Sequence, residues 1–184
     1  MDQREFHALF AQLAPRLHGF LVRYGADPEM AGDIVQDAFV RLWHARETLD
    51  RGGNVKSYLY TAALNLLRDQ WRRQKVVPQV SLDVLHGSGF ETHDPSQDHH
   101  AAAGHAELES RVRQAVAALP DPMRELILLR MYSGLTFDEI AASRGEHVRT
   151  VKRRVRAALD TLADTLERHG YSREGGAAWL AILL

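Results

Sequence analysis

The chain of 184 residues contains no cysteine, which excludes disulfide bonds, thiolate metal sites and thiol catalysis. Long apolar runs are also missing. The longest, residues 177–184, falls far below the roughly 20 residues that a membrane-spanning helix needs. The N-terminus mixes charged and apolar residues and lacks the features of a secretion signal. We therefore expect a cytoplasmic protein without membrane insertion.

Catalytic motifs are lacking as well. The sequence has no glycine-rich phosphate loop, no nucleophile motif and no histidine–glutamate metal motif. We expect a protein that is not an enzyme and needs no cofactor. Five histidines gather at positions 86, 93, 99, 100 and 105. Because no rigid scaffold fixes their spacing, a solvated tract is a simpler interpretation than a metal site.

Charge is divided between segments of the chain although the formal net charge is only -1. Residues 76–106 hold four acids and neither lysine nor arginine, whereas residues 145–156 hold five basic residues and one acid. A near-zero total therefore does not exclude a nucleic-acid partner, because the basic residues are concentrated in one place.

The first half of the chain has the apolar spacing of three amphipathic helices, over about 4–24, 28–46 and 55–73. Pro15 predicts a bend or break in the first helix. Asp27 is suited to cap the second helix, with Pro28 at its first position. These helices predict a small domain over residues 1–74.

Helical spacing disappears after the third helix and returns in the second half. We assign residues 75–106 to an acidic, histidine-rich flexible linker, 107–169 to a second helical domain and 170–184 to an apolar tail of unknown role. Because the tail is too apolar to remain in water, we expect it to pack on a domain or bind a partner. The predicted fold is all-α: two small helical domains joined by a flexible linker.

The second domain carries a helix-turn-helix pattern. Thr136 and Glu139 form the signature of a capping box at the start of a short helix, and Gly145 lies where that helix should end. A longer helix is predicted from about Val148. Its exposed side carries cationic and hydroxyl groups at Arg149, Thr150, Lys152, Arg153 and Arg156. A solvated basic helix is the simple alternative, but the capped helix and turn favour recognition of a DNA major groove.

Two further polar faces lie in the first domain. The second helix presents Asp33, Gln36 and Asp37 beside Phe39 and Trp43, a pattern typical of a partner-binding helix. The alternative is that the two aromatic residues belong to the core. The third helix carries aromatic, amide and guanidinium groups suited to unpaired bases, although such a face can also be plain solvated surface; its members are Tyr58, Thr61, Asn65, Arg68 and Arg72.

Four ordered blocks resemble the extracytoplasmic-function (ECF) sigma factors of RNA polymerase. Residues 31–43 are similar to the family's clamp-binding helix, and 55–73 to its promoter-melting and minus-ten-reading helix. Residues 118–125 and 134–141 resemble the helices leading into its minus-thirty-five-reading helix-turn-helix. The resemblance implies a subunit that binds the β′ clamp helices and β subunit of core polymerase, promoter DNA and, where one exists, an anti-sigma factor.

The resemblance also implies roles for individual residues. It assigns polymerase contact to Asp33, Gln36, Asp37 and Phe39, the melted strand or its backbone to Tyr58, Asn65, Arg72 and Arg73, and the upstream element to Arg149, Thr150, Lys152, Arg153 and Arg156. The family usually has tryptophan at position 58 and serine at position 153, so these departures bear on which promoter is read. The basic pattern with Thr136 favours the branch that serves iron-uptake signalling.

One alternative from another class remains open. A helix-turn-helix transcriptional regulator that binds duplex DNA on its own would have the same second domain. The order of Asp33, Gln36, Asp37 and Phe39 distinguishes the two hypotheses, because such a regulator has no need of that face.

Overall fold

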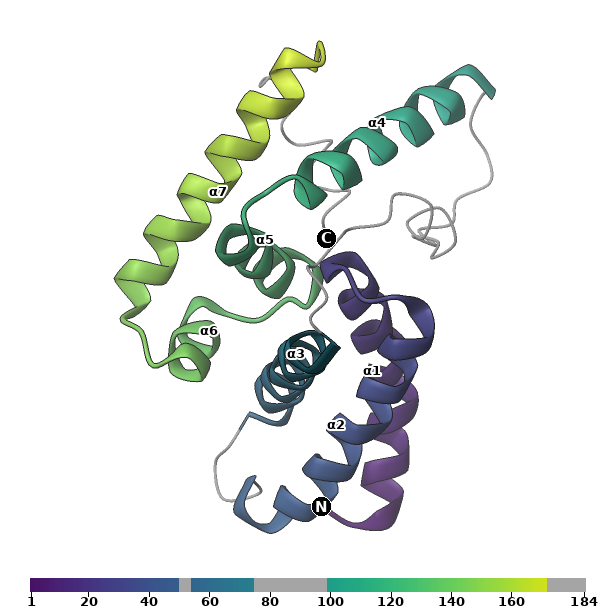
Figure 1. Cartoon of the computed structure of the whole chain (residues 1–184), viewed down its shortest axis with the longest axis vertical. Coiled ribbons are helices and arrows are strands. Elements are labelled where there is room, and N and C mark those ends of the chain that lie inside the picture. The colour runs from purple at the N-terminus through teal and green to yellow at the C-terminus, as the bar shows by residue number, and fades with distance from the viewer. Residues whose placement is uncertain (50–53, 75–98, 172–184) are drawn as a thin grey trace.

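A computed structural model describes residues 1–49, 54–74 and 99–171, with side chains from 107 onward in the last range. Every regular element in these ranges is helical, which confirms the all-α prediction (Figure 1). The elements are α1 (Gln3–Tyr24), α2 (Pro28–Leu49), α3 (Val55–Gln74), α4 (His99–Ala117), α5 (Asp121–Ile127), the π-helix η2 (Leu128–Tyr132), α6 (Phe137–Arg144) and α7 (Val148–Arg168). We call α1–α3 the N-terminal unit and α4–α7 the C-terminal unit.

Local capping fixes where the first two helices begin. The Asp2 carboxylate accepts a hydrogen bond from the Glu5 backbone amide at 2.8 Å, and the Glu5 side chain closes the capping box. Asp27 Oδ1 accepts from the amide of Met30 at 2.9 Å, as predicted for a helix-capping aspartate. Of the bend or break predicted at Pro15, the break does not occur, because α1 continues through this residue to Tyr24.

The N-terminal unit buries one apolar stripe from each of its three helices. The α2 helix packs against both α1 and α3, and α1 also contacts α3. Side chains with almost no exposed surface fill the space between them: Leu17, Phe20, Leu21, Ile34, Leu42, Leu59, Tyr60 and Leu67. The Phe20 and Tyr60 rings meet edge to face with centroids 4.9 Å apart. This core holds the outward faces of α2 and α3 in fixed positions.

The C-terminal unit begins earlier than the sequence suggested. The α4 helix starts at His99, within the segment assigned to the flexible linker. Residues 101–103 are three consecutive alanines, the strongest helix formers, and they outweigh Gly104 and the neighbouring histidines. After the turn at Pro120, α5 continues into η2, where the amide of Ser133 bonds to the carbonyl of Leu128 at 2.9 Å.

The helix-turn-helix forms as its sequence predicts. The Thr136 hydroxyl accepts from the Glu139 amide at 3.2 Å, and Glu139 accepts from the Thr136 amide at 2.6 Å. Gly145 has φ 62°, the left-handed conformation that favours glycine at a helix end. Leu135 and Ile140 are fully buried beneath the cap, and α7 then begins at Val148.

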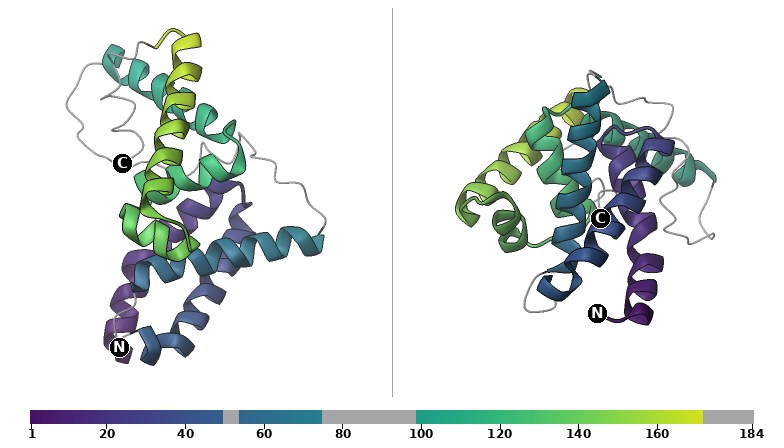
Figure 2. Two further views of the ribbon diagram at one scale, coloured as in Figure 1. Left: turned by 90° about the vertical axis from the view of Figure 1, so that its left-hand side faces the viewer. Right: turned by 60° about the horizontal axis from the view of Figure 1, so that its bottom comes forward.

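The two units pack directly against each other. Figure 2 shows α3 running beneath the C-terminal helices, and α3 contacts α6 while α1 contacts η2. Gly19 allows the second contact, because a Cβ built there would lie 2.5 Å from the Tyr132 hydroxyl. The guanidinium of Arg23 lies over the Tyr132 ring at 4.4 Å and donates to the Gly19 carbonyl at 3.1 Å. A larger residue at position 19 would therefore require the Tyr132 side chain to shift.

Replacing the helix-capping threonine tests the stability of the helix-turn-helix. We expect Thr136→Ala to lower the free energy of unfolding by about 1 kcal/mol, because the Glu139 amide loses its partner. Urea unfolding followed by circular dichroism measures the change. The matched control is Thr161→Ala on the exposed side of α7, where the hydroxyl only bonds back to the Ala157 carbonyl. Equal losses in the two variants would contradict a specific contribution from the cap.

Candidate functional site

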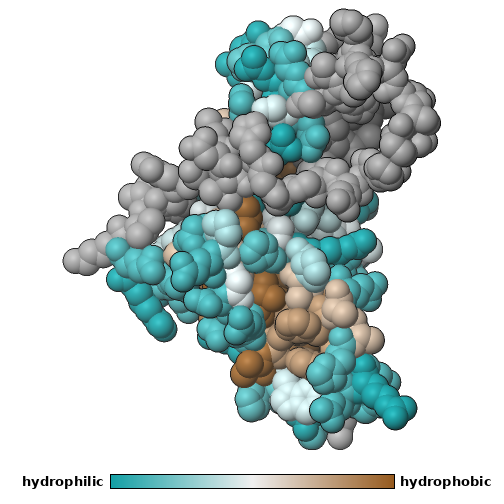
Figure 3. Space-filling view, turned by 90° about the vertical axis from the view of Figure 1, so that its right-hand side faces the viewer, coloured by the Kyte–Doolittle hydropathy of each residue, from teal (hydrophilic) through white to brown (hydrophobic). Residues whose placement is uncertain are grey.

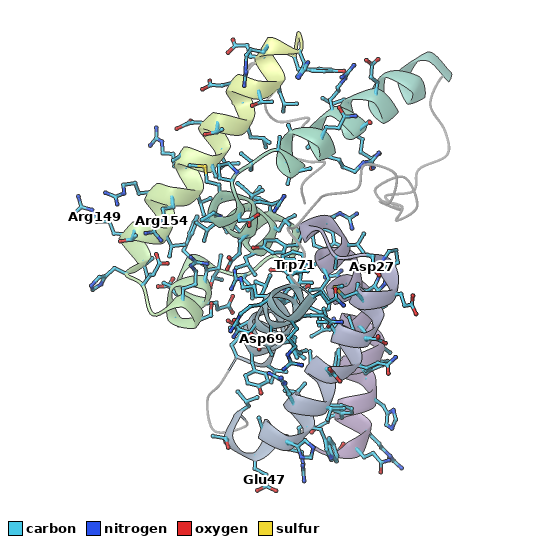
Figure 4. The ribbon with its side chains drawn as sticks, viewed as in Figure 1. Asp27, Glu47, Asp69, Trp71, Arg149 and Arg154 are labelled. Atoms are coloured by element: carbon cyan, nitrogen blue, oxygen red, sulfur yellow. The ribbon has the colours of Figure 1, made fainter. Side chains whose placement is uncertain are left out.

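The exposed face of α7 gathers the predicted cationic residues. Arg149, Lys152, Arg153 and Arg156 are exposed and Thr150 is half-buried, and together they line a shallow hollow of about 450 Å³. Figure 4 shows Arg149 extending outward from the first turn of α7, away from both units. The opposite side of α7 is anchored by a fully buried stripe of Val151, Ala158, Leu162 and Leu166. The fold thus presents these cations to solvent, as a DNA-recognition helix requires.

Neighbouring basic residues differ from this set in their contacts. Arg154 pairs with Glu146 at 2.6 Å, and Arg144 pairs with the same carboxylate at 2.9 Å. Burial alone would raise the pKa of Glu146, but hydrogen bonds and charge from the two arginines lower it below its ordinary value. The Arg130 guanidinium lies over the Phe137 ring, 4.9 Å from its centroid. The Lys152 ammonium lies over the same ring, 5.6 Å from its centroid. Arg130 was missed because it follows an apolar run on another helix.

The acidic face of α2 is exposed as the sequence predicted, except for its aromatic member. Asp33, Gln36 and Asp37 are exposed, whereas Phe39 has an exposed fraction of only 2%. Its ring packs edge to face against Phe10 with centroids 4.7 Å apart. The alternative that Phe39 belongs to the core is therefore correct for most of its side chain.

An apolar groove of about 410 Å³ lies beside this acidic face. Its walls come from α1 and α2, and Phe39 forms part of its floor. The lining residues are Gln3, Phe6, His7, Phe10, Gln36, Phe39, Val40 and Trp43. Phe10 is 40% exposed and Val40 is 54% exposed. Figure 3 shows this side of the molecule, where an apolar area in the lower half is bordered by hydrophilic residues.

The groove contains residues that sequence reasoning placed elsewhere or did not single out. Val40 is an apolar residue outside the buried stripe of α2. An apolar residue on the polar side of an amphipathic helix is the sequence signal that could have indicated the groove. The Trp43 and Phe6 rings lie edge to face with centroids 4.9 Å apart, and both line the groove. Acidic groups beside an exposed apolar groove form the anatomy of a protein interface.

The structure divides the predicted face of α3 between two environments. Asn65, Arg72 and Arg73 are exposed, and Tyr58 is half-buried against the core. Arg72 pairs with Asp69 at 2.5 Å on the same helix. Thr61, Asn65 and Arg68 line a polar cleft of about 240 Å³ toward the C-terminal unit. Part of this face therefore borders the C-terminal unit, whereas Arg72 and Arg73 do not line the cleft.

A buried carboxylate joins the walls of this cleft. Glu125 in α5 pairs with Arg68 of α3 and with Arg144 of α6. Burial opposes the charged form of Arg68, but the carboxylate and a hydrogen bond with Tyr24 raise the Arg68 pKa above its ordinary value. Nearby, Asn54 donates to the Glu139 carboxylate, and the Ser57 hydroxyl donates to the Glu139 carbonyl at 3.4 Å.

Other kinds of site are not found within the described ranges. No three histidine, aspartate or glutamate side chains of these ranges gather as they would around a metal ion. His86 and His93 lie outside these ranges, as do the side chains of the other three linker histidines. None of the helices that the structure describes is both long and apolar enough to cross a membrane.

Comparisons with known families match both units. The family described as Sigma-70 region 2 matches residues 9–76, and the family described as Sigma-70, region 4 matches residues 109–162. The first match covers most of α1 and all of α2 and α3. The second covers the helix-turn-helix and the cationic residues of α7.

Whole-length relatives agree with these matches. The ECF RNA polymerase sigma factor RpoE of Cereibacter sphaeroides is 30% identical over 162 residues, which cover 88% of this chain and 86% of the relative. The RNA polymerase sigma factor CnrH of Cupriavidus metallidurans is 31% identical over 170 residues, which cover 89% of this chain and 88% of the relative. The solved structure of CnrH in complex with the cytosolic domain of CnrY is also similar, with a TM-score of 0.64 and 27% sequence identity. The match covers 91% of this chain and 90% of the CnrH chain. The chain therefore belongs to the ECF RNA polymerase sigma factors, the subunits that direct RNA polymerase to specific promoters.

Proposed function

We propose that this sigma factor binds core polymerase through the α2 face and the adjacent apolar groove. The observation that carries the proposal is the exposed row Asp33, Gln36 and Asp37 beside a groove whose apolar lining has no cover among the described residues. Acids at the rim orient a partner, and apolar side chains at the centre supply affinity. Phe39 supports this surface from beneath, and Trp43 and Val40 supply apolar contacts.

The α3 face is proposed to hold the melted promoter strand. The half-buried ring of Tyr58 offers a stacking surface, Asn65 offers an amide, and Arg72 and Arg73 offer charge to the backbone. These four residues lie on one helix that the N-terminal core holds rigid, so the strand would be bound in a defined register.

The α7 helix is proposed to read the upstream duplex element. Its cations form an exposed cluster at the leading turns, and the helix-turn-helix scaffold is the one that places such a helix in a major groove. Arg149 and Arg153 are the candidates for base edges. Lys152 and Arg156 are the candidates for phosphates, and the half-buried Thr150 contributes a hydroxyl beside them.

The remaining assignments are also proposals. The sigma factor would act in the cytoplasm as a specificity subunit rather than as an enzyme, because its exposed surfaces suit binding. CnrH was solved with the cytosolic domain of a second protein, CnrY. By analogy, an anti-sigma factor would restrain this chain by covering its polymerase-binding face or one of its two DNA-binding faces.

Reversing one acid on α2 tests the polymerase interface. We expect Asp37→Arg to weaken binding to core polymerase at least about tenfold, because a reversed charge at an interface repels the groups that matched the original one. Fluorescence anisotropy with purified core enzyme measures the affinity. The matched control is Glu107→Arg, which makes the same charge change on exposed α4. If the two variants bind core polymerase with equal affinity, α2 is not part of the interface.

Alanine substitutions on α7 separate base contacts from phosphate contacts. We expect Arg149→Ala or Arg153→Ala to cost roughly 1–3 kcal/mol at a cognate upstream element and to relax preference at one or two base pairs. Lys152→Ala or Arg156→Ala should weaken all promoters alike and lower the salt dependence by about one phosphate contact.

Transcription by holoenzyme from a library of upstream elements, at two salt concentrations, measures these effects. Arg154→Ala is the control, because Arg154 lies outside the cationic cluster and pairs with Glu146. If each of the four cluster variants lowers transcription from every promoter by the same factor, the cluster contacts only the DNA backbone and reads no bases.

A further inference from the structure

Lys152 differs in its chemistry from the arginines of the cationic cluster on α7. The chain has three lysines against twenty arginines, and Lys152 is the only lysine of α7. An arginine guanidinium is planar and presents its donors in a fixed fork, whereas a lysine ammonium is a point charge on a flexible four-carbon stem. An exposed lysine therefore loses much rotamer freedom when a phosphate fixes it, unless the protein already orders its stem.

An aromatic ring from the neighbouring helix contacts this lysine. The Lys152 ammonium is 5.6 Å from the centroid of the Phe137 ring, within the range of a cation–π contact. Phe137 is the first residue of α6, and its half-buried ring packs against the core. The capping box at Thr136 fixes the start of this helix, and α6 packs against α7, so the ring has a defined position beside the lysine.

Arg130 of η2 contacts the same ring. Its guanidinium is 4.9 Å from the ring centroid and donates to the Leu135 carbonyl at 3.3 Å. The Phe137 ring therefore carries two cations, which repel each other. Because of this repulsion the ring orders Lys152 only weakly, and a phosphate can draw the ammonium away at little cost.

The neighbouring Arg154 shows another way to hold a cation. It pairs with the Glu146 carboxylate at 2.6 Å, and the carboxylate offsets its charge. A DNA phosphate would have to displace a negative charge from Arg154, but only a neutral ring from Lys152. The ring thus orders the lysine side chain and leaves its charge available to DNA.

We propose that Phe137 is a positioning residue for promoter recognition, whose ring holds the Lys152 stem in the orientation that meets the DNA backbone. The proposal rests on the function proposed for α7, in which Lys152 contacts a phosphate. A cation–π contact at an exposed site favours the ordered side chain by a factor of about two to five. Loss of the ring should weaken promoter binding by that factor, and only where Lys152 is present.

Nuclear magnetic resonance of the free chain tests whether the ring orders the lysine. Reductive methylation keeps the charge of a lysine and places isotope-labelled methyl groups on its nitrogen. Because the chain has three lysines, the spectrum holds few signals, and the one that Lys152→Ala removes belongs to Lys152. We expect a ring-current shift of this signal that disappears in Phe137→Leu and remains in Phe137→Tyr, which keeps an aromatic ring. A signal at the same position in wild type and both variants would overturn the contact.

Promoter binding by holoenzyme tests the functional consequence. Fluorescence anisotropy with a promoter selected from the library of upstream elements measures the affinity. We expect Phe137→Leu to weaken binding about two- to fivefold when Lys152 is present and to have no further effect in the Lys152→Ala background. Phe137→Tyr should bind like wild type. The matched cycle of Phe137→Leu with Arg156→Ala should be additive, because Arg156 belongs to the same cluster one turn further along α7.

A loss of packing at Phe137 would act equally in every background, so the contrary results are distinct. An equal loss with and without Lys152 would show that the ring only supports the fold, and would overturn the positioning role. Coupling of the same size to Arg156 would place the effect in the packing of α6 on α7 and would overturn it too. If Lys152→Ala weakens binding but shows no coupling to Phe137, the proposed function stands and only the positioning role is rejected. If Lys152→Ala and Arg156→Ala both leave binding unchanged, the function proposed for these cations fails, and the positioning role fails with it.

Discussion

A buried carboxylate needs partners, and at Glu125 this requirement organises the molecule. A charge removed from water is stable only when it is paired and hydrogen-bonded. Its two partners are Arg68 from the N-terminal unit and Arg144 from the helix-turn-helix. Because one pair crosses between units and the other stays within the C-terminal unit, the same group supports the local fold and the seating of the two halves.

Local sequence rules predicted the parts of the structure that short-range chemistry controls. The capping residues Asp27 and Thr136 and the glycine at position 145 all have the predicted geometry, because a cap depends on residues three or four positions away. The exposed cations of α7 followed for the same reason, since a strong apolar stripe fixes which side of that helix faces outward. The iron-uptake branch remains a prediction.

Features that depend on contacts between distant segments were predicted less well. Phe39 was expected on an exposed face, but its ring packs against Phe6 and Phe10 of α1, and its assignment to the polymerase interface stays a prediction. The face of α3 was read as continuous, yet Thr61, Asn65 and Arg68 line a cleft shared with residues of α5, η2 and α6. The apolar periodicity of a helix shows which residues face away from the core of its own bundle. It does not show whether another unit covers those residues.

The π-helix η2 holds an additional residue at the point where the two halves meet. Its hydrogen-bonded loop contains one more residue than an α-helical loop, and Tyr132 stands at its end. Because the wider turn takes up the extra residue, the chain beyond it keeps nearly the direction that α-helical winding would give. The turn therefore absorbs an insertion without redirecting the side chain that meets Gly19.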